Sequence, residues 1–383
     1  DVREELKKVI GKLSQLKNHI QTDKPLDLLV DLDPDLKQWN NDLEKKIEKY
    51  GTPSFFNCDW LFAECYLYRK LREIFSLTRL LFSFDPFVYQ KSTVLNDSLP
   101  KITELIEFLT YNGHLNPQEL NGSEKKSALT TLIKNALWAN QIDLALSGGS
   151  TEVKHHLLND IDKWNDKILV DDLPKVYPII LSDKTDKVVE YILDNSGYEF
   201  LSDLCLADFL VTKCGVKTIN FRVKRIPWYV SDVTMTDFKK TISALGSYTH
   251  PLCKKLAEKW QTYLDTGVWR VHSDQFWCLG LSYTNMPKID PILYQSLAKS
   301  DLIIFKGDLN YRKLVQDVNW DPTTAFSLSL GKFHPAPLVA LRTCKADTIA
   351  GLGIGIAEKA AQISENWLVS GEFAVIQFDR PSD

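Results

Sequence analysis

The sequence contains few cysteines and no long hydrophobic run. Its seven cysteines are an odd number, are scattered along the chain and form no CxxC pair, which favours reduced thiols of an intracellular protein over a disulfide framework or a zinc site. No stretch of about 18 apolar residues, the length needed to cross a membrane, occurs. The first ten residues lack the apolar core of a signal peptide. We therefore expect a cytoplasmic location, with a nuclear one also allowed, and no membrane partner.

The chain also lacks a strong charge of either sign. Its 46 Lys and Arg residues and 50 Asp and Glu residues are interspersed, and the formal net charge is -4. A nucleic acid is not expected as a partner, because such binding requires a basic field. The motifs HExxH, GxSxG and GxxxxGK[ST] are absent, which excludes the common zinc peptidases, serine hydrolases and P-loop enzymes.

The pattern of apolar residues changes about halfway along the chain. In the first part they recur at three- and four-residue spacing, as in Leu61, Cys65 and Tyr68, which indicates helices. In the second part short apolar runs alternate with amphipathic segments, as is typical of an α/β fold. Since 383 residues exceed the usual size of one core, we predict a mainly helical domain at 1–170 and an α/β domain at 171–383.

Short apolar runs define the strands expected in the second domain. These strands are 188–193, 218–223, 228–230, 269–271, 302–305, 338–341 and 374–378. The amphipathic segments between them predict helices at 198–212, 236–245, 291–300 and 311–315.

Polar residues follow four of these predicted strands directly. Asp194 and Asn195 follow the first strand, Asp232 follows the third, and the segments 306–310 and 342–347 follow two later ones. These groups should converge, because an open α/β sheet binds ligands outside the carboxyl ends of its strands. Two carboxylates and an amide oxygen suit a hard cation such as Mg²⁺ or Mn²⁺, and the Lys and Arg residues opposite suit a phosphate. Phosphoryl-group hydrolysis is the natural reaction class of such a set.

Each of these residues also has an ordinary structural explanation. Asp194 or Asp232 alone is often the N-cap of the next helix, and Asn195 near Gly197 is typical of a turn. The basic residues after the later strands are commonly solvated. The functional interpretation depends on the whole set lying at one edge of the sheet.

Three motifs resemble the damage-control phosphatases. DNSGYE at 194–199, KGDLNY at 306–311 and RTCK at 342–345 occur in this order along the chain. The last motif matches the RTxK element of the subfamily that includes a protein described as an acidic-residue methyltransferase, and the fungal members of that subfamily are the nearest likeness.

The first half of the chain resembles the same subfamily. The similar segments are WLFAECYLYRKL at 60–71, FDPF at 84–87 with Lys91, and LWANQIDLAL at 137–146. The resemblance therefore covers most of the chain. It implies a Rossmann-like α/β/α sandwich core with an N-terminal mainly helical domain.

The resemblance also implies roles for individual residues. Asp194, Asn195 and Asp232 would be catalytic and would hold a divalent metal, which could be Mn²⁺, Mg²⁺, Co²⁺ or Ni²⁺. The residues implied to bind the substrate or its phosphate are Glu199, Lys306, Gly307, Asp308, Leu309, Asn310, Arg342 and Lys345. The implied activity is hydrolysis of phosphate monoesters of sugar phosphates, such as fructose 1-phosphate, and of related damaged or misplaced metabolites.

Three questions stay open at the level of the sequence. Asp194 could attack phosphorus itself or only hold the metal beside an attacking water, and the oligomeric state is undetermined. An S-adenosylmethionine-dependent methyltransferase is an alternative suggested by the subfamily's name and by the glycines at 351, 353 and 355, although this string does not follow a first strand as a nucleotide fingerprint should. A non-catalytic sugar-phosphate-binding module is the other alternative.

Overall fold

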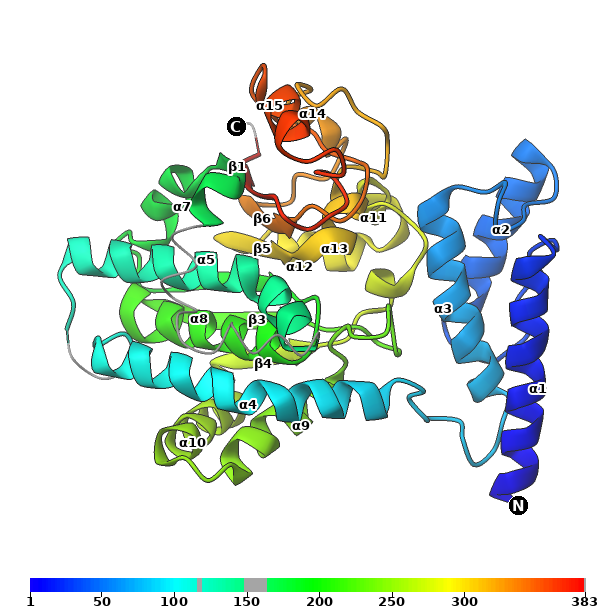
Figure 1. Ribbon diagram of the computed structural model, residues 1–383, viewed down its shortest axis with the longest axis horizontal. Helices are drawn as coiled ribbons and strands as arrows, with labels where there is room; N and C mark the ends of the chain where they lie inside the picture. Colours follow the sequence, from blue (N-terminus) through cyan, green and yellow to red (C-terminus); the bar gives the residue numbers. More distant parts are fainter. Residues whose placement is uncertain (116–118, 148–163, 382–383) are drawn as a thin grey trace.

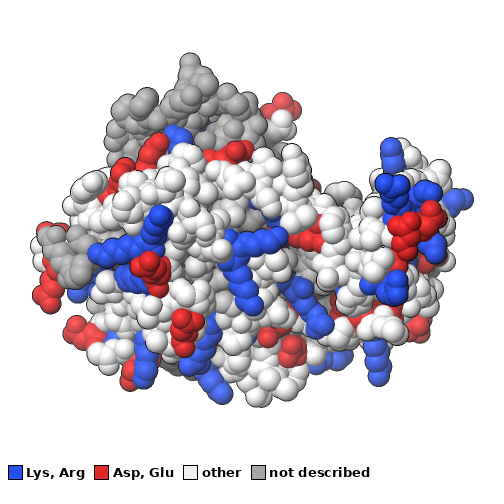
Figure 2. Space-filling view, turned by 90° about the horizontal axis from the view of Figure 1, so that it is seen from below, with Lys and Arg blue, Asp and Glu red and all other residues white. Residues whose placement is uncertain are grey.

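The computed structural model describes residues 1–115, 119–147 and 164–381, without the side chains of residues 142–147. In this part of the chain a seven-stranded sheet is flanked by helices, and a unit of three helices (α1 to α3) lies to one side (Figure 1). None of the described helices is both long and apolar enough to cross a membrane. On the face seen in Figure 2, Lys and Arg side chains are interspersed with Asp and Glu side chains.

Among the described residues five α-helices precede the first strand, and helices and strands then alternate along most of the remaining sequence. The N-terminal helices are α1 (Val2–Gln21), α2 (Leu36–Tyr50), α3 (Trp60–Ser76), α4 (Val88–Tyr111) and α5 (Gly122–Ser147). The strands are β1 (Ile168–Asp171), β2 (Lys187–Ile192), β3 (Val216–Arg222), β4 (Trp269–His272), β5 (Leu302–Lys306), β6 (Leu338–Thr343) and β7 (Ala374–Asp379). The helices between the strands are α7 (Leu173–Ile180), α8 (Tyr198–Cys214), α9 (Met235–Ser247), α10 (Pro251–Asp265), α11 (Met286–Ile289), α12 (Pro291–Leu297), α13 (Gly307–Leu314), α14 (Phe326–Ser329) and α15 (Ile356–Ile363). Short 3₁₀ segments occupy Asn165–Lys167, Gln275–Cys278 and Tyr283–Asn285.

The order of strands in the sheet is β1-β7-β6-β5-β2-β3-β4. From β2 the chain proceeds to β3 and β4 on one side, and then returns to place β5 and β6 on the other side, all of them parallel. Strand β7 is antiparallel to β6 and pairs with β1. The sheet therefore has a topological switch point between β2 and β5, where the loops after the two strands diverge and leave room for a ligand.

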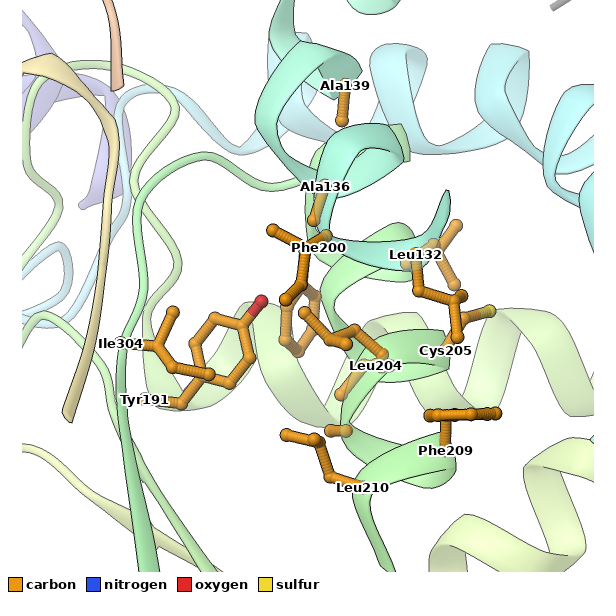
Figure 3. Packing of buried hydrophobic residues seen from close by; sticks show 14 of the residues in the cluster. Leu132, Ala136, Ala139, Tyr191, Phe200, Leu204, Cys205, Phe209, Leu210 and Ile304 are labelled. Carbon is orange, nitrogen blue, oxygen red and sulfur yellow. The ribbon is translucent and has the colours of Figure 1, made fainter. Parts of the chain in front are cut away.

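Both faces of the sheet are buried, as the alternation along β5 shows. Leu302 and Ile304 belong to the core that contains α4, α5, α8, α9 and α10, whereas Ile303 and Phe305 belong to the core on the opposite face. Figure 3 shows the first of these cores, where residues of α5 and α8 pack beside Tyr191 of β2. The predicted α/β sandwich is confirmed, because side chains of a strand alternate between two apolar layers.

Helices α4 and α5 pack against the sheet domain rather than against α1 to α3. Both contact α8, and the ammonium of Lys91 on α4 binds Asp237 at 2.6 Å and Asp85 at 2.6 Å. Asp237 also completes the capping box of α9 with Thr234, so this lysine ties α4 to the start of a helix beside the sheet. The division of the chain at residue 170 stays a prediction, and the apolar contacts of α4 and α5 favour placing it earlier.

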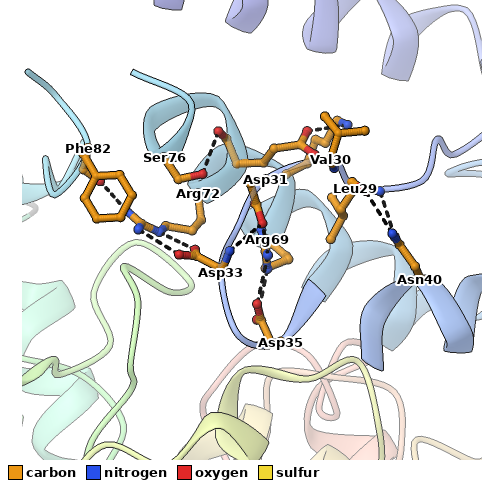
Figure 4. Close-up of polar contacts among 12 residues, drawn as sticks. Leu29, Val30, Asp31, Asp33, Asp35, Asn40, Arg69, Arg72, Ser76 and Phe82 are labelled. Carbon is orange, nitrogen blue, oxygen red and sulfur yellow. Dashed lines mark hydrogen bonds and ion pairs between the residues drawn. The ribbon is translucent and has the colours of Figure 1, made fainter. Parts of the chain in front are cut away.

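The three-helix unit is held together by a buried ion cluster. Arg69 of α3 is fully buried and donates to both oxygens of Asp31 and both oxygens of Asp35, at 2.5 to 3.0 Å (Figure 4). Beside it, Arg72 pairs with Asp33 at 2.7 Å. The segment between α1 and α2 is thus fixed to α3 by charge-assisted, bidentate hydrogen bonds.

Three details of the predicted elements were wrong. Residues 228–230 do not form a strand: Tyr229 and Val230 lie in a turn with φ values of 42° and 67°. Trp228 is buried and the other two residues are half-buried, and the rings of Trp228 and Tyr229 pack on Tyr68 of α3. The helix predicted at 311–315 begins earlier, at Gly307. Strand β1 was not predicted, because its four residues lie at the edge of the sheet and are only partly buried.

Candidate active site

The predicted site residues gather around a cavity of about 300 Å³ at the switch point, which we call the switch-point pocket. It is lined by Leu137, Asn140, Asp194, Asn195, Glu199, Tyr229, Ser231, Asp232, Gly307, Asp308, Leu309, Arg312, Leu341, Thr343 and Lys345. Of the residues predicted from the sequence, Lys306, Asn310 and Arg342 are not part of this lining. The volume is at the lower end of the range for small-molecule sites, which suits a metabolite rather than a polymer.

Asp194 and Gly307 meet where β2 and β5 end. Asp194 is 7% exposed, and Gly307 begins α13 with a φ of +84°. A Cβ atom on residue 307 would lie 1.9 Å from Asp194 Oδ2 and 2.3 Å from Asp194 Cγ. No side chain can occupy that space, so glycine is required at position 307 for the Asp194 carboxylate to keep its place.

The loop that carries Asp232 is held in a strained turn. Its backbone pairs with the loop after β2, and the N–H of Ser196 donates to the carbonyl of Ser231 at 2.7 Å. Just before this point Tyr229 and Val230 both have positive φ values, which is rare for a non-glycine residue and rarer for a β-branched one. Such strain costs about 1 to 3 kcal/mol per residue and is kept only where the surroundings enforce it, commonly at functional sites.

Asn195 joins these two loops through its side chain. Its amide oxygen accepts a hydrogen bond from the Ser231 hydroxyl at 2.6 Å. Its amide nitrogen donates to Asp194 Oδ2 at 2.8 Å and to Glu199 Oε2 at 3.0 Å. The side chain is therefore oriented from both ends, and one lone pair of its oxygen is left for a ligand.

Asp232 pairs with a lysine that the sequence did not single out. Lys224 Nζ lies 3.0 Å from Asp232 Oδ2, and both side chains are 2% exposed. Lys224 also donates to the carbonyl of Leu193 at 2.9 Å. Burial alone would lower the pKa of Lys224, but the carboxylates of Asp232 and Asp194 raise it, so this lysine is a permanent cation behind the site.

A second buried ion cluster lies behind Glu199. Lys306 Nζ is 2.9 Å from Glu199 Oε1 and 2.9 Å from Asp203 Oδ1. The Tyr191 hydroxyl donates to the same Asp203 oxygen at 2.8 Å, and Asn140 donates to Glu199 Oε2 at 3.1 Å. Lys306 thus forms ion pairs with two carboxylates, and it positions Glu199 instead of facing the pocket.

The electrostatics of these clusters suit a divalent cation. Burial, followed by the nearby charges of Glu199 and Asp232, raises the pKa of Asp194 well above its ordinary value. The carboxylates Asp194, Glu199, Asp203 and Asp232 are buried together, and among the described residues the lysines buried beside them are Lys224, Lys306 and Lys313, so these carboxylates outnumber the lysines by one.

Two carboxylates and one oriented amide oxygen also form the all-oxygen donor set that Mg²⁺ or Mn²⁺ prefers. Within the described residues no cluster of three or more His, Cys, Asp or Glu side chains is arranged to hold a metal. Because Asp194, Asp232 and Asn195 would supply only three protein donors, they fit a site that leaves several positions for water or a phosphate, not a closed structural site.

Arg342 and Asp308 stabilise the wall of the pocket that contains Lys345. Arg342 is completely buried; its Nε donates to Asp308 Oδ1 at 2.7 Å, and its two terminal nitrogens donate to backbone carbonyls at 2.6 and 2.8 Å. The same Asp308 oxygen accepts from the Lys345 N–H at 3.1 Å. The Lys345 ammonium lines the pocket and donates to the Asn140 side chain. Lys345 can therefore reach a bound phosphate, whereas Arg342 supports the loop that carries it.

Asn310 and Leu309 differ in position although they are neighbours. Leu309 lines the pocket. Asn310 is fully buried beneath it, where it donates to the carbonyl of Lys306 at 2.7 Å and accepts from the Tyr283 hydroxyl at 2.5 Å. Asn310 consequently fixes the first turn of α13 to the end of β5.

Two residues of the pocket that the sequence did not indicate, Arg312 and Tyr229, are held in place by helix α3 of the three-helix unit. Arg312 lines the pocket and donates to Glu64 of α3 at 2.5 Å and to Asp317 at 2.8 Å. Tyr229 stacks on Tyr68 of α3, with ring centroids 4.6 Å apart, and its hydroxyl donates to Glu64 at 3.3 Å. Helix α3 therefore holds one wall of the pocket.

The glycine-rich string at 351–355 has a packing explanation. Gly351 has a φ of +77°, and a Cβ atom there would lie 2.5 Å from the Gln377 side chain. Gly355 has a φ of +80° at the N-cap of α15. The string follows no strand directly and its glycines are explained by a tight loop, so nothing in it supports binding of S-adenosylmethionine.

Sequence comparisons agree with the motifs. The family model described as the damage-control phosphatase ARMT1-like domain matches residues 1–360. Proteins named damage-control phosphatase ARMT1 are similar over nearly the whole chain: 37% identical in Xenopus tropicalis (97% of this chain and 87% of the relative) and 35% in Homo sapiens (98% and 87%). The nearer likeness to fungal members stays a prediction.

A structural comparison supports the fold. The crystal structure of a DUF89 family protein from Pyrococcus horikoshii is 16% identical, covers 98% of both chains and gives a TM-score of 0.50. Since the family model spans nearly the whole chain, a phosphatase that uses a divalent metal is the expected chemistry of the switch-point pocket. The chain belongs to the damage-control phosphatase family, within the group that carries the ARMT1-like domain.

Proposed function

We propose that the switch-point pocket hydrolyses phosphate monoesters of small sugar phosphates, such as fructose 1-phosphate, and related damaged metabolites. The observation that carries this proposal is the excess of buried carboxylates around Asp194, in a pocket of about 300 Å³ that also contains Lys345. A metal and a phosphate would neutralise one another there, and the volume suits a hexose-sized substrate. We also propose a cytoplasmic location, with a nuclear one also allowed.

Asp194, Asn195 and Asp232 would hold the metal, which could be Mn²⁺, Mg²⁺, Co²⁺ or Ni²⁺. When bound, this ion supplies charge neutralisation at the phosphoryl oxygens and activation of a nucleophile. Lys345 would bind another phosphate oxygen. The first residues of α13, Gly307 to Leu309, line the pocket, so the backbone N–H groups at this helix N-terminus would contribute to phosphate binding.

Glu199 would contact the sugar hydroxyls. Its carboxylate faces the pocket, and Lys306 lowers its pKa against the effect of burial, so it remains an acceptor at neutral pH. Because Lys306, Asn195 and Asn140 fix its two oxygens, its geometry is set before a substrate arrives. Preorganised acceptors of this kind discriminate between substrates by the position of their hydroxyl groups.

Asp194 is central to either route of attack. Its carboxylate would attack phosphorus and break the bond to the sugar oxygen, so that the sugar leaves as an alcohol and water then hydrolyses the aspartyl-phosphate to release inorganic phosphate. Alternatively, it would orient a water that attacks phosphorus directly and displaces the same alcohol. Acid quenching during turnover, followed by mass spectrometry, separates the routes, because only the first adds a phosphoryl group to Asp194.

The test is a screen of purified protein against phosphate esters and the four metals, with release of inorganic phosphate as the readout. Asp194→Asn should abolish turnover and also the rise in melting temperature caused by Mn²⁺, because a metal that binds only the folded state stabilises it. The matched control is Asp186→Asn, which removes a carboxylate that is 69% exposed and should change neither readout. Full activity of Asp194→Asn would refute the proposal, and substrate binding without phosphate release by the wild type would favour the non-catalytic alternative.

A further inference from the structure

A second and larger cavity, of about 750 Å³, lies between the three-helix unit and the sheet domain, and we call it the inter-unit cavity. One wall comes from α2 and the start of α3, and the other comes from loops around residues 280–285, 316–319 and 347–348. Its lining includes Trp60, Asn285, Gln316, Asp317, Asn319 and Thr348. None of these residues lines the switch-point pocket.

The lining combines an exposed indole with uncharged hydrogen-bonding groups. Trp60, the first residue of α3, is 59% exposed, which is unusual for the largest aromatic side chain. Gln316, Asn285 and Asn319 lie on the other wall. The amide nitrogens of Gln316 and Asn285 donate to Ser329 and Ser282, so these two side chains offer their amide oxygens as acceptors. An exposed aromatic face beside several donors and acceptors is the surface that stacks on the C–H face of a sugar while bonding its hydroxyls.

The charges of the inter-unit cavity make it unsuitable for a phosphate. Lys46 is the basic residue among its lining residues, and it is paired with Asp59. Asp317 is paired with Arg312, and Asp347 adds a further acidic group. No cation in this lining is available for an anion, in contrast to Lys345 in the switch-point pocket. An uncharged ligand therefore suits this cavity.

The wall of the cavity contains a strained backbone segment. Gln316 and Asp317 have φ values of 67° and 53°, a left-handed conformation that non-glycine residues seldom adopt. Asp317 accepts from Arg312 at 2.8 Å and from the N–H of Leu61 at 3.2 Å. Because strain of this kind is concentrated at functional sites, it is an observation independent of the cavity's size and chemistry.

Asp317 also connects the two cavities. Its partner Arg312 lines the switch-point pocket, so a ligand that moves Asp317 would move a wall of that pocket. A second connection passes through Arg342. This arginine donates to the carbonyl of Thr348, in the inter-unit cavity, at 2.6 Å and to the carboxylate of Asp308, in the switch-point pocket, at 2.7 Å.

We propose that the inter-unit cavity is a second binding site, for a neutral polyhydroxylated molecule such as a free hexose, and that its occupancy alters the switch-point pocket through Asp317 and Arg312. Trp60 stacks on the sugar ring, and the amides of Asn285, Gln316 and Asn319 bind its hydroxyls. The binding part of this proposal does not depend on the proposed function. The coupling part uses phosphatase activity only as a reporter.

Binding is tested by saturation-transfer difference NMR with D-fructose on the full chain. The transfer signals should be reduced in Trp60→Leu and Asn319→Ala, which remove the stacking face and one amide from opposite walls, and any signal left in both variants reports binding of the sugar at the switch-point pocket. The matched control is Tyr89→Ala, which removes an aromatic side chain that is 83% exposed on α4, and its signals should equal those of the wild type. Absent signals in the wild type, or signals unchanged in both cavity variants, would overturn the site. Stronger Trp60-dependent binding of fructose 1-phosphate than of fructose would overturn the ligand class.

Coupling is tested by the KM of the phosphatase reaction with and without free fructose. The sugar should shift the KM of the wild type and leave that of Trp60→Leu unchanged, since linked sites affect each other's affinity. If fructose only competed with the substrate at the switch-point pocket, it would shift the KM of both proteins equally. An equal shift in both proteins, or no shift in the wild type, would overturn the coupling. A protein that shows no phosphatase activity at all would refute the proposed function while leaving the NMR result valid.

Discussion

Replacing Gly307 by alanine tests whether Asp194 occupies the position that the site requires. The added Cβ would overlap the Asp194 carboxylate, 1.9 Å from its Oδ2 atom, and an overlap of this size can be relieved only by moving Asp194 or the first turn of α13. A displacement of about 1 Å at a reacting group costs on the order of 10²-fold in rate, which corresponds to about 2.7 kcal/mol in the activation free energy. We therefore expect kcat/KM to fall by at least about 100-fold.

The backbone effect of this substitution must be separated from the overlap. A left-handed conformation costs an L-residue about 1 to 2 kcal/mol, and this applies wherever a glycine with positive φ is replaced. Gly355 provides the matched control, because its φ is +80° and a Cβ there would have nothing within 4 Å. Gly355→Ala should lose about 1 to 2 kcal/mol in the free energy of unfolding but keep its activity.

Phosphate release and urea denaturation of the two variants, in the presence of Mn²⁺, give the comparison. If Gly307→Ala retained kcat/KM within about tenfold of the wild type, Asp194 would have tolerated displacement and could not be the central residue of the pocket. An equal loss of activity in Gly355→Ala would show that backbone strain, and not the overlap with Asp194, is responsible.

Three further predictions concern buried charges. Lys224→Met should lower the free energy of unfolding, measured by urea titration, by about 3 to 5 kcal/mol, as expected when a buried carboxylate loses its partner. Mn²⁺ should restore part of this stability. No loss of stability would show that Asp232 does not depend on Lys224. The pKa of Asp203 is raised by burial to about 7, so the folded state binds more protons than the unfolded state between about pH 4 and 7, and stability falls as pH rises through this window. Asp203→Asn should reduce this dependence of stability on pH in metal-free protein. An unchanged dependence would contradict the assignment to Asp203. Arg69→Met should destabilise the protein by about 3 to 5 kcal/mol and more than the less buried Arg72→Met, as measured by thermal unfolding; equal effects would refute the importance of the buried cluster.

Much of the fold follows from patterns in the sequence that have a direct physical cause. Strands β2, β5 and β6 are buried on both faces, and continuous apolar runs in the sequence indicate such strands reliably. The run at 228–230 is also apolar, but Trp228 and Tyr229 pack against Tyr68 of α3 instead of against neighbouring strands. Packing against a helix that is distant in the sequence produces no periodic pattern of apolar residues. The prediction of a strand at 228–230 was therefore wrong because of a tertiary contact.

The candidate site was partly visible in the sequence for a topological reason. Residues directly after parallel strands must lie at one edge, and Asp194, Asn195 and Gly307 are such residues. Asp203 could have been found as well, because it lies four residues after Glu199 on a predicted helix and therefore on the same face. Arg312, Tyr229 and Lys224 could not, since their roles depend on how α3 and the turn after β3 pack.

The family motifs combine residues that face the ligand with residues that hold them in place. In KGDLNY, the backbone of Gly307 makes room for Asp194, while Asn310 fixes the start of α13 to the end of β5. In RTCK, Arg342 binds Asp308 and two carbonyls, while Lys345 lines the pocket. Supporting residues of this kind are as constrained as those that touch substrate, because small misplacements are costly.

The buried charges around Asp194 also link stability to metal binding. Without a metal, the carboxylates repel one another and the pKa of Asp194 is raised, so the folded state bears an unfavourable excess of carboxylates that Lys224, Lys306 and Lys313 only partly offset. A bound divalent cation would remove this excess, so its binding free energy would contribute to folding. Active sites commonly keep such destabilising arrangements for function. The inter-unit cavity carries no comparable buried excess, because Asp59 and Asp317 pair with Lys46 and Arg312 and the remaining acidic residue, Asp347, is exposed. The two sites are therefore expected to respond differently to chelators: removal of metal should lower stability through the switch-point pocket while leaving sugar binding at Trp60 intact.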